Sequence, residues 1–260
     1  MNRPIVLLSD FGYKDEFVGV MKGVILSINH DATIIDLSHD IPQQNINKAA
    51  LTLYTSYKYF PDNSIFLAIV DPDVGSNRRA ILMKLNNQYF ISPDNGILSY
   101  ILDKNIPDAV FELINSKYFN KNIISTFHGR DIFAPLAAQL SLGIDPSEIG
   151  TNADYSSLTR IAELKCIVES DKIIGEIIDY DNFGNAICSI DPSGLSLDNY
   201  ILNISNMLEC HFFKSYYFFQ NDIPCAYRGS SGFIEIGLKN SSFERKFKFS
   251  LGTEITLINK

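Results

Sequence analysis

The sequence predicts two domains of different fold classes. Residues 1–157 are expected to form an α/β domain, with a mostly parallel sheet and helices on both faces, and residues 158–260 an all-β, barrel-like domain. In the first part, apolar runs of strand length alternate with segments of helical period. A polar, turn-rich segment then follows over 145–159. Beyond it only short strand-like runs remain, which is typical of a small barrel or sandwich.

Each element of the α/β domain is predicted from the spacing of its apolar residues. In the expected helices these recur every three to four positions, and in the expected strands they form continuous runs. The predicted strands are Ile5–Ser9, Thr33–Leu37, Ile65–Val70, Ala80–Leu85 and Gln88–Ser92, and the predicted helices are Glu16–Ile28, Ile46–Tyr59, Ile97–Leu102 and Phe133–Leu142.

In the C-terminal domain no helix is predicted, because helical periods vanish there. Turn residues separate the apolar runs at short intervals. The expected strands are Glu163–Val168, Lys172–Ile178, Ala186–Ile190, Ser215–Phe219, Phe233–Leu238, Lys246–Phe249 and Glu254–Leu257.

Composition narrows the class of partner. A net charge of −8 disfavours nucleic-acid binding, which usually needs a basic face. No apolar run reaches the roughly 18 residues of a membrane helix, and the start lacks the features of a signal peptide. The four cysteines show no CxxC spacing, which disfavours a zinc site. We therefore expect a cytoplasmic protein with buried thiols and with no nucleic-acid, membrane or metal partner.

The first candidate site follows the apolar strand that ends at Asp71. A loop with proline and glycine leads from this carboxylate to Arg78 and Arg79. Loops beyond strand C-termini form the ligand crevice of an open α/β sheet, so Asp71 and Arg78 are candidates for chemistry. A structural alternative is that Asp71 caps a turn and both arginines are solvated.

A second strand ends at Asp10, and Asp15 follows before a helix. The loop lacks the glycines of a GxGxxG phosphate site. A carboxylate here could accept both O–H groups of a ribose diol, or bind an ammonium group or a metal. Alternatively, both aspartates cap the following helix.

Phe127 and His128 precede the last helix of the first domain. His128, Asp71 and Arg78 are each expected where a strand meets a loop, so together they form a plausible triad. A lone histidine can also be structural, and the sequence leaves both possibilities open.

Two loops of the second domain also carry candidate residues. Asp181, Phe183 and Asn185 lie in one loop, where an aromatic face could stack on a purine and an amide could pair with an adenine edge. Ser230 and Ser231 lie in a Gly/Ser loop whose N–H groups could hold a carboxylate. Both loops could equally be simple turns.

Seven motifs taken together resemble one family. The chain is similar to the S-adenosyl-L-methionine (SAM) hydrolases, also called SAM hydroxide adenosyltransferases, which are relatives of the fluorinase and chlorinase. The resemblance covers nearly the whole chain. The motifs, in order, are Asp10-Phe11-Gly12, Asp36–Ile41, Val70–Arg79, Pro93-Asp94-Asn95-Gly96, Phe127–Asp131, Asp181–Asn185 and Ser231–Ile236.

The resemblance implies a reaction, an assembly and roles for the candidate residues. The reaction is SAM plus water giving adenosine and L-methionine, with SAM as the substrate and no cofactor. The assembly is a homotrimer with active sites between one subunit's N-terminal domain and its neighbour's C-terminal domain. The implied roles are the nucleophilic water for Asp71, Arg78 and His128, the ribose hydroxyls for Asp10, the wall beside C5′ for Phe127, the adenine for Phe183 and Asn185, and the methionine end for Asp15, Asp181, Ser230 and Ser231. Either Asp71 or His128 could be the base.

Three alternatives remain open from the sequence. The first is a non-catalytic SAM or adenosine sensor, and the second a phosphatase-like enzyme with a metal on Asp10, Asp15, Asp71 and Asp131. The third is a SAM-dependent halogenase. Halogenases typically carry an aromatic residue where this chain has Asp71, whose charge would repel a halide. Asp73 replaces the glycine usual in the family, at some cost if that position needs a positive φ.

Overall fold

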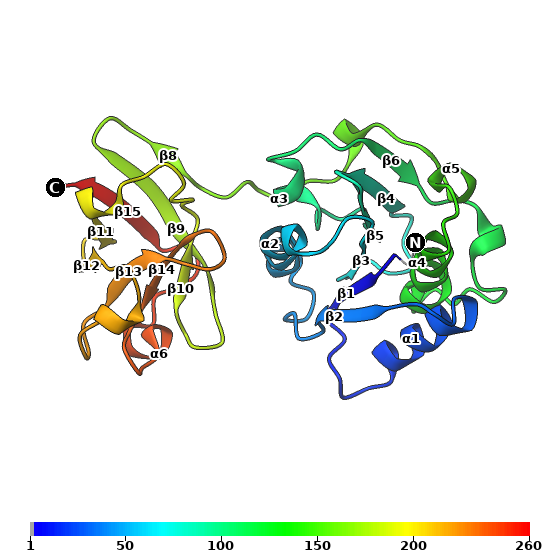
Figure 1. Cartoon of the computed structure of the whole chain (residues 1–260), viewed down its shortest axis with the longest axis horizontal. Helices are drawn as coiled ribbons and strands as arrows, with labels where there is room; N and C mark the ends of the chain where they lie inside the picture. The colour runs from blue at the N-terminus through cyan, green and yellow to red at the C-terminus, as the bar shows by residue number, and fades with distance from the viewer. Residues whose placement is uncertain (1–2) are drawn as a thin grey trace. The chain divides into compact units, whose positions relative to one another are not determined.

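The computed structural model describes residues 3–260 as two compact units, one ending at Glu163 and the other spanning Leu164–Lys260 (Figure 1). The boundary expected at residue 158 lies a few residues earlier in the sequence. Residues 158–163 go with the first unit because Leu158 is buried in its core and the Ile161 N–H donates to Ser99 Oγ at 3.0 Å.

The first unit contains a seven-stranded sheet in the order β2-β1-β3-β5-β4-β6-β7. The strands β2, β1, β3 and β5 run parallel, and β4, β6 and β7 extend the sheet with antiparallel pairs. The elements are β1 Ile5–Ser9, α1 Phe17–Ile28, β2 Ile34–Ser38, α2 Ile46–Ser56, β3 Ile65–Ile69, β4 Ala80–Leu85, β5 Gln88–Pro93, α3 Ser99–Leu102, β6 Ala109–Glu112, η3 Gly129–Phe133, α4 Ala134–Ser141, α5 Pro146–Ile149 and β7 Thr151–Asn152. The predicted α/β class is confirmed, and the antiparallel half is the part that strand–helix alternation did not indicate.

Helices cover both faces of this sheet, as predicted (Figure 1). Successive strand side chains point to opposite faces, so neighbouring residues of β1 enter different cores. Leu7 packs in the core that contains Met21 of α1 and Leu136 of α4. Leu8 packs in the core that contains Leu53 of α2 together with residues of α3. The sheet is therefore buried on both sides, which explains the continuous apolar runs.

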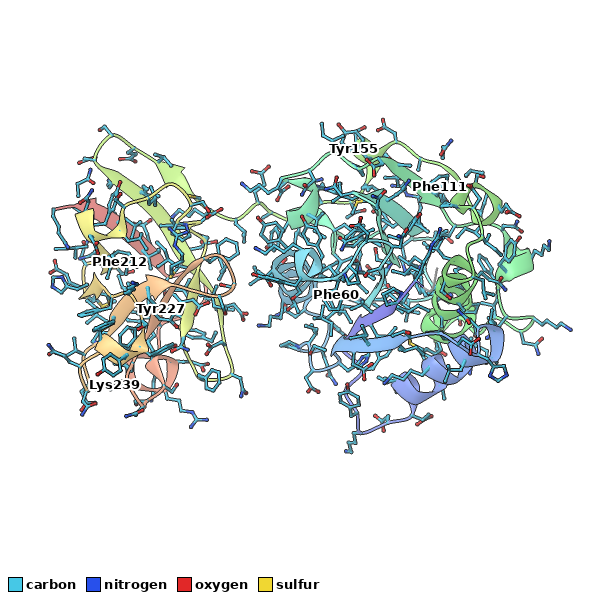
Figure 2. The ribbon with its side chains drawn as sticks, in the orientation of Figure 1. Phe60, Phe111, Tyr155, Phe212, Tyr227 and Lys239 are labelled. Atoms are coloured by element: carbon cyan, nitrogen blue, oxygen red, sulfur yellow. The ribbon has the colours of Figure 1, made fainter. Side chains whose placement is uncertain are left out.

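Aromatic side chains contribute to both cores, among them Phe60 and Phe111 (Figure 2). Phe66 and Phe90 stack with ring centroids 4.9 Å apart, and Phe60 meets the Phe66 ring edge-on at 5.3 Å. Phe111 belongs to the core on the opposite face. Burying each such ring contributes roughly 1.5–3 kcal/mol.

The second unit is a closed barrel, as predicted. Its ring is β10-β14-β13-β12-β11-β15-β9, closed by pairing of β9 with β10, and β8 pairs with β9. Closure removes the free strand edges of the ring. The elements are β8 Ile167–Val168, β9 Lys172–Tyr180, β10 Ala186–Cys188, β11 Tyr200–Ile204, β12 Leu208–Phe212, β13 Cys225–Arg228, β14 Ile234–Gly237, α6 Phe243–Phe247 and β15 Glu254–Asn259.

Two predicted strands of this unit are wrong. Lys246–Phe249 overlaps α6, which begins after Ser242, whose Oγ accepts the Arg245 N–H at 3.1 Å. Ser215–Phe219 contains only a short 3-10 turn, Tyr216–Phe218. The strands β11, β12 and β13 were not predicted; β12 alternates apolar and polar residues, whereas β11 and β13 are short apolar runs that were passed over.

Three of the four cysteines are buried, as expected, whereas Cys166 is exposed, which corrects the expectation of a buried thiol at that position. Burial raises the pKa of Cys188 and brings that of Cys210 to about 12. Among residues 3–260, no helix is long and apolar enough to cross a membrane.

Candidate active site

The parallel strands bring candidate residues of the first unit to one edge of the sheet. Ser9 ends β1 and pairs with Ile69, which ends β3, so Asp10 and Asp71 emerge from adjacent strands. Arg78 precedes β4, which runs antiparallel to β5 and starts from the same edge. The next two strands along the chain, β2 and β3, flank β1 on opposite sides. Ligands of open α/β sheets bind at such a switch point, beyond the strand C-termini.

Arg78 joins Asp71 to His128. Its Nε donates to Asp71 Oδ1 and Oδ2 at 2.9 and 3.0 Å, and one terminal nitrogen contacts Asp71 Oδ2. The same nitrogen lies 3.0 Å from His128 Nδ1. The Asp71 and Arg78 side chains are only 5% and 9% exposed. The structural alternative of solvated arginines therefore does not describe Arg78.

The direction of the Arg78–His128 hydrogen bond fixes the tautomer of the imidazole. A guanidinium only donates, so His128 Nδ1 must accept and the ring proton lies on Nε2. Burial lowers the pKa of His128, and the neighbouring Arg78 charge lowers it further. His128 is thus a neutral ring that offers one N–H.

A cavity of about 130 Å³ lies beside this group. Its polar lining includes the Asp71 and His128 side chains, whereas Arg78 is not among the described lining residues. Aromatic and aliphatic side chains form the rest of the wall, including Phe11, Phe17, Ile69, Val74 and Phe127. Arg78 therefore holds both polar groups from behind, and a ligand in the cavity meets the carboxylate and the imidazole.

A buried ion pair supports the segment that carries His128. Asp131, in the π-helical turn η3, accepts from Arg130 Nε at 2.7 Å and from the Ile124 N–H at 2.8 Å. The Arg130 hydrogen bond is the main reason that the pKa of Asp131 falls to about 2. The Phe127 ring packs edge-on against Phe11 at 5.9 Å, which closes the cavity wall.

The two carboxylates of the first loop differ in their surroundings. Asp10 Oδ2 accepts the Gln44 N–H at 2.8 Å, so Asp10 does not cap the helix that follows it. Asp15 is exposed, and α1 has no side-chain cap. Across residues 3–260, no group of three or more His, Cys, Asp or Glu side chains is arranged to hold a metal ion.

In the second unit, Asp181 organises the loop that presents Phe183 and Asn185. One carboxylate oxygen accepts the N–H groups of Phe183 and Asn185 at 2.9 and 2.8 Å, and the other accepts Asn185 Nδ2 at 2.7 Å. The Phe183 side chain is 78% exposed, whereas Asn185 is only 3% exposed. Both line a hollow of about 900 Å³ together with Tyr216. The loop is therefore a turn, as the structural alternative states, and also the wall of a pocket.

The Gly/Ser loop is held by a buried glutamate. Ser231 Oγ lies 2.9 Å from Glu235 Oε1 and donates its single proton there, while Ser230 is exposed. Toward a ligand, the Ser231 hydroxyl can therefore only accept a hydrogen bond. Gly229 is required here, because a Cβ would lie 2.0 Å from Glu235 Oε1.

Residues 5–150 match the SAM hydroxide adenosyltransferase N-terminal domain, and residues 175–256 match the C-terminal domain of the same family. The chain belongs to the SAM hydroxide adenosyltransferase family. A protein from Thermus thermophilus named (R)-S-adenosyl-L-methionine hydrolase is 31% identical over 98% of this chain and 100% of its own. One of the same name from Methanocaldococcus jannaschii is 34% identical over 89% and 87%. The crystal structure of an uncharacterized conserved protein from Thermotoga maritima is 33% identical, with a TM-score of 0.92 over 98% of this chain and 100% of that one.

The position of Asp73 is not strained in this chain. Asp73 has no positive φ, and its carbonyl accepts the Ser76 N–H at 3.0 Å. The demanding position is Gly75, with φ +86° and the Ser125 carbonyl oxygen 2.7 Å from where a Cβ would stand. Having Asp73 in place of the family glycine therefore does not force a non-glycine residue into the left-handed backbone conformation.

The second arginine has a different task in this family member. Arg79 Nε donates to Asp94 Oδ2 at 2.8 Å, and a terminal nitrogen donates to the Ser157 carbonyl at 2.7 Å. Asp94 Oδ1 also accepts the Thr159 N–H at 2.9 Å. Asn95 donates to the carbonyl of Val70, the residue before Asp71, at 2.7 Å. The Pro-Asp-Asn-Gly motif thus ties the segment around residue 158 to the end of β3.

The sequence did not indicate Tyr216, which lines the same pocket as Asn185. Its hydroxyl lies 2.5 Å from that of Tyr227, and burial raises the pKa of both phenols. At Gly237, a Cβ would lie 2.5 Å from Asn185 Oδ1 and 3.3 Å from the Tyr216 hydroxyl. Tyr216 falls within the run Ser215–Phe219 that was expected to be a strand, and no sequence signal marked it as a pocket residue.

Proposed function

We propose that this chain hydrolyses SAM to adenosine and L-methionine. Its family membership and its relatives named (R)-S-adenosyl-L-methionine hydrolase support the proposal. The observation that carries it is the Arg78 side chain joining Asp71 to His128 beside an apolar cavity. A charged and a neutral polar group facing an apolar cavity suit the activation of one small nucleophile.

The proposed reaction makes one bond and breaks one. The water oxygen bonds to C5′ as the C5′–sulfur bond breaks, and the electron pair of that bond neutralises the sulfonium. Methionine therefore leaves as a neutral thioether and needs no general acid. The water proton must go to a base or to solvent. Catalysis rests on orienting the water in line with the C5′–S bond and accepting its proton.

We assign the base to Asp71 rather than His128. His128 Nδ1 already accepts from Arg78 and Nε2 already carries a proton, so the neutral ring has no free acceptor. A second proton on the His128 ring would be repelled by the Arg78 charge, which is one of the causes that lower the pKa of His128. Asp71 is an anion that lines the cavity and has lone pairs beyond those bound to Arg78. His128 Nε2–H would donate to the water oxygen and orient it.

The remaining candidates divide into two groups that support the proposed substrate contacts. In the first unit, Asp10 would hold the ribose hydroxyls and Phe127 would line the wall beside C5′. In the second unit, Phe183 would stack on the adenine and Asn185 would pair with its edge. The methionine end is left to Asp15, Asp181, Ser230 and Ser231, although Asp181 and Ser231 already bond within their own loops. We propose a cytoplasmic homotrimer with sites between subunits, as the resemblance to the family implies.

Incubating the purified protein with SAM in chelator-containing buffer, and following products by chromatography, tests the proposal. Adenosine and methionine in equal amounts are expected. SAM binding without products would instead indicate a sensor, and a 5′-halogenated adenosine formed in added halide would indicate a halogenase. Loss of activity in chelator would indicate a metal enzyme.

Two substitutions separate the roles of base and orienting group. Asp71→Asn should remove most turnover while SAM still binds. His128→Asn places an amide oxygen near the former Nδ1, which keeps an acceptor for Arg78, and should retain clearly more activity. Equal loss in the two variants would contradict the assignment of the base to Asp71.

A further inference from the structure

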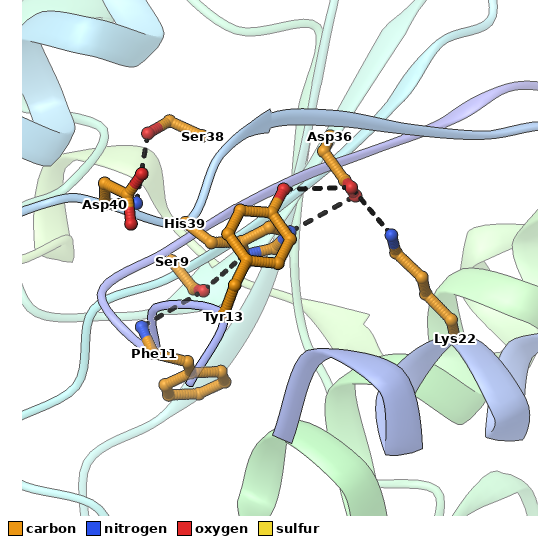
Figure 3. Close-up of polar contacts among 8 residues, drawn as sticks. All are labelled: Ser9, Phe11, Tyr13, Lys22, Asp36, Ser38, His39 and Asp40. Atoms are coloured by element: carbon orange, nitrogen blue, oxygen red, sulfur yellow. Dashed lines mark hydrogen bonds and ion pairs between the residues drawn. The ribbon is translucent and has the colours of Figure 1, made fainter. Parts of the chain in front are cut away.

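A chain of polar side chains, buried at its Ser9–His39 end and exposed at its Asp36–Tyr13 end, lies next to the Asp10 loop and outside the cavity described above (Figure 3). Ser9, the last residue of β1, places its Oγ 2.6 Å from Nδ1 of His39, which follows β2. His39 Nε2 lies 3.2 Å from Asp36 Oδ1. Asp36 Oδ2 accepts from Lys22 Nζ at 2.7 Å and from the Tyr13 hydroxyl at 3.0 Å. Ser9 and His39 are 1% and 2% exposed.

The hydrogen bonds of this chain can run in one direction only. Burial pushes the pKa of Asp36 up, but hydrogen bonds from Lys22, His39 and Tyr13 leave it below its ordinary value. Asp36 is therefore an anionic acceptor, and His39 Nε2 carries the proton. Burial lowers the pKa of His39, so the ring is neutral and Nδ1 accepts the Ser9 O–H, which leaves Ser9 Oγ to accept the Phe11 N–H at 3.4 Å.

A serine, a histidine and an aspartate in contact suggest a nucleophile, but this serine is not one. Ser9 Oγ is buried, and neither Ser9 nor His39 lines the cavity beside His128. The contacts of His39 lead instead to the backbone of the next loop. Through Ser9 its ring reaches the Phe11 N–H, and its carbonyl accepts the Gly12 N–H at 2.8 Å.

Asp10 lies between these two attachments. The Gln44 N–H donates to Asp10 Oδ2 at 2.8 Å, and Asp10 Oδ1 has no hydrogen-bond donor among the described residues. We propose that His39 is a positioning residue that sets the free oxygen of Asp10 for the hydroxyls of a bound ribose. This inference rests on the proposed function, because it takes the ligand to be a nucleoside. The same attachment places the Phe11 ring in the cavity wall.

Two isosteric substitutions separate the bonds of His39. His39→Asn keeps an acceptor where Nδ1 stood and loses the contact with Asp36. His39→Gln keeps a donor where Nε2 stood and loses the acceptor for Ser9. Binding of adenosine and 3′-deoxyadenosine to the full chain, measured by calorimetry, reports how well Asp10 recognises the ribose.

We expect the natural protein to prefer adenosine by roughly 10- to 100-fold, the range of a hydrogen bond to a charged group. His39→Gln should reduce this preference to within about threefold, and His39→Asn should keep most of it. Asp10→Ala should abolish it, and adding His39→Gln to Asp10→Ala should change nothing further. Ser9→Ala should behave as His39→Gln does, and serves if that variant fails to fold.

Several results would overturn the inference. Independent, additive effects of the Asp10 and His39 changes would show that His39 does not act through Asp10. Equal preference for the two nucleosides in the natural protein, or an unchanged preference in both His39→Gln and Ser9→Ala, would also reject it. The proposed hydrolysis is judged separately, because a protein that forms no adenosine from SAM can still show this preference, and an active hydrolase can lack it.

Discussion

Replacing Arg78 with lysine tests whether the guanidinium fork, rather than its charge alone, organises the nucleophile site. The arginine reaches both Asp71 oxygens and His128 Nδ1 at once. A lysine ammonium is a single point with no fork, and it can serve Asp71 or His128 but not both in the same geometry. Arg78→Lys therefore keeps the charge and loses the alignment of base and imidazole.

The size of the effect follows from the bonds that lysine cannot keep. These are the bond to His128 and one bond to the carboxylate, and a hydrogen bond to a charged group is worth roughly 1.5–3 kcal/mol. At the lower end of that range the two lost bonds amount to about 3 kcal/mol, or roughly a hundredfold in kcat. KM should change by less than about threefold, because Arg78 is not among the described residues lining the cavity. Steady-state formation of adenosine measures both constants.

The neighbouring arginine supplies a matched control. Arg79→Lys makes the same chemical change one residue away, where the partners are Asp94 and Ser157. Its kcat should stay within about threefold of the natural value if the Arg78 fork is what matters. A kcat loss of equal size in both variants, or none in Arg78→Lys, would refute the reasoning.

Three further predictions concern stability. Gly184 and Gly194 have similar φ values of +81° and +80°, but a Cβ would meet a neighbouring atom only at Gly184, where Ser242 Oγ would lie 2.0 Å away. In urea unfolding, Gly194→Ala should lower the free energy of unfolding by about 1 kcal/mol. Gly184→Ala should lower it by about 1–3 kcal/mol more. The pKa values of His39 and His128 in the folded chain lie below the ordinary 6.5, so below that pH the unfolded chain binds more protons than the folded one. The free energy of unfolding should therefore fall as the pH is lowered from about 6.5, and this fall should be smaller in His39→Asn. Asp94→Asn weakens the bonds to Arg79 and Thr159 and should speed limited proteolysis near residue 158.

The sequence predicted the fold best where the apolar pattern was continuous. The parallel strands β1 and β3 are buried on both faces, so every position except Ser9 is apolar and their bounds are clear. In the barrel only one face of each strand is buried. In β12, Leu-Glu-Cys-His-Phe, apolar and polar residues therefore alternate, and no continuous apolar run marks the strand. The alternating stretch Lys246–Phe249 was misread as a strand because its phenylalanines pack from a short helix, α6, and the turn after it.

The site was predictable in its members and not in their connections. Strand ends bring Asp10 and Asp71 together by topology alone, and sequence reasoning can find that. It could not show that Arg78 turns to Asp71 while Arg79 turns to Asp94, because adjacent side chains in an extended loop diverge for reasons of tertiary packing. Nor could it show that the Asp181 carboxylate is used within its own loop, which leaves Asn185 as the residue held ready in the pocket.

His39 and His128, both in the first unit, share one physical arrangement. Each is mostly removed from solvent, has a pKa below its ordinary value and keeps Nδ1 as an acceptor, toward Arg78 in His128 and toward Ser9 in His39. A neutral imidazole with one fixed acceptor and one fixed donor transmits orientation without adding charge. Asp71 and Asp10 are the anions set by these surroundings, one at each of two adjacent strand ends. The edge of the sheet thus carries two oriented carboxylates, and the hydrogen-bond directions behind them, rather than the identity of the acids alone, decide what each can do.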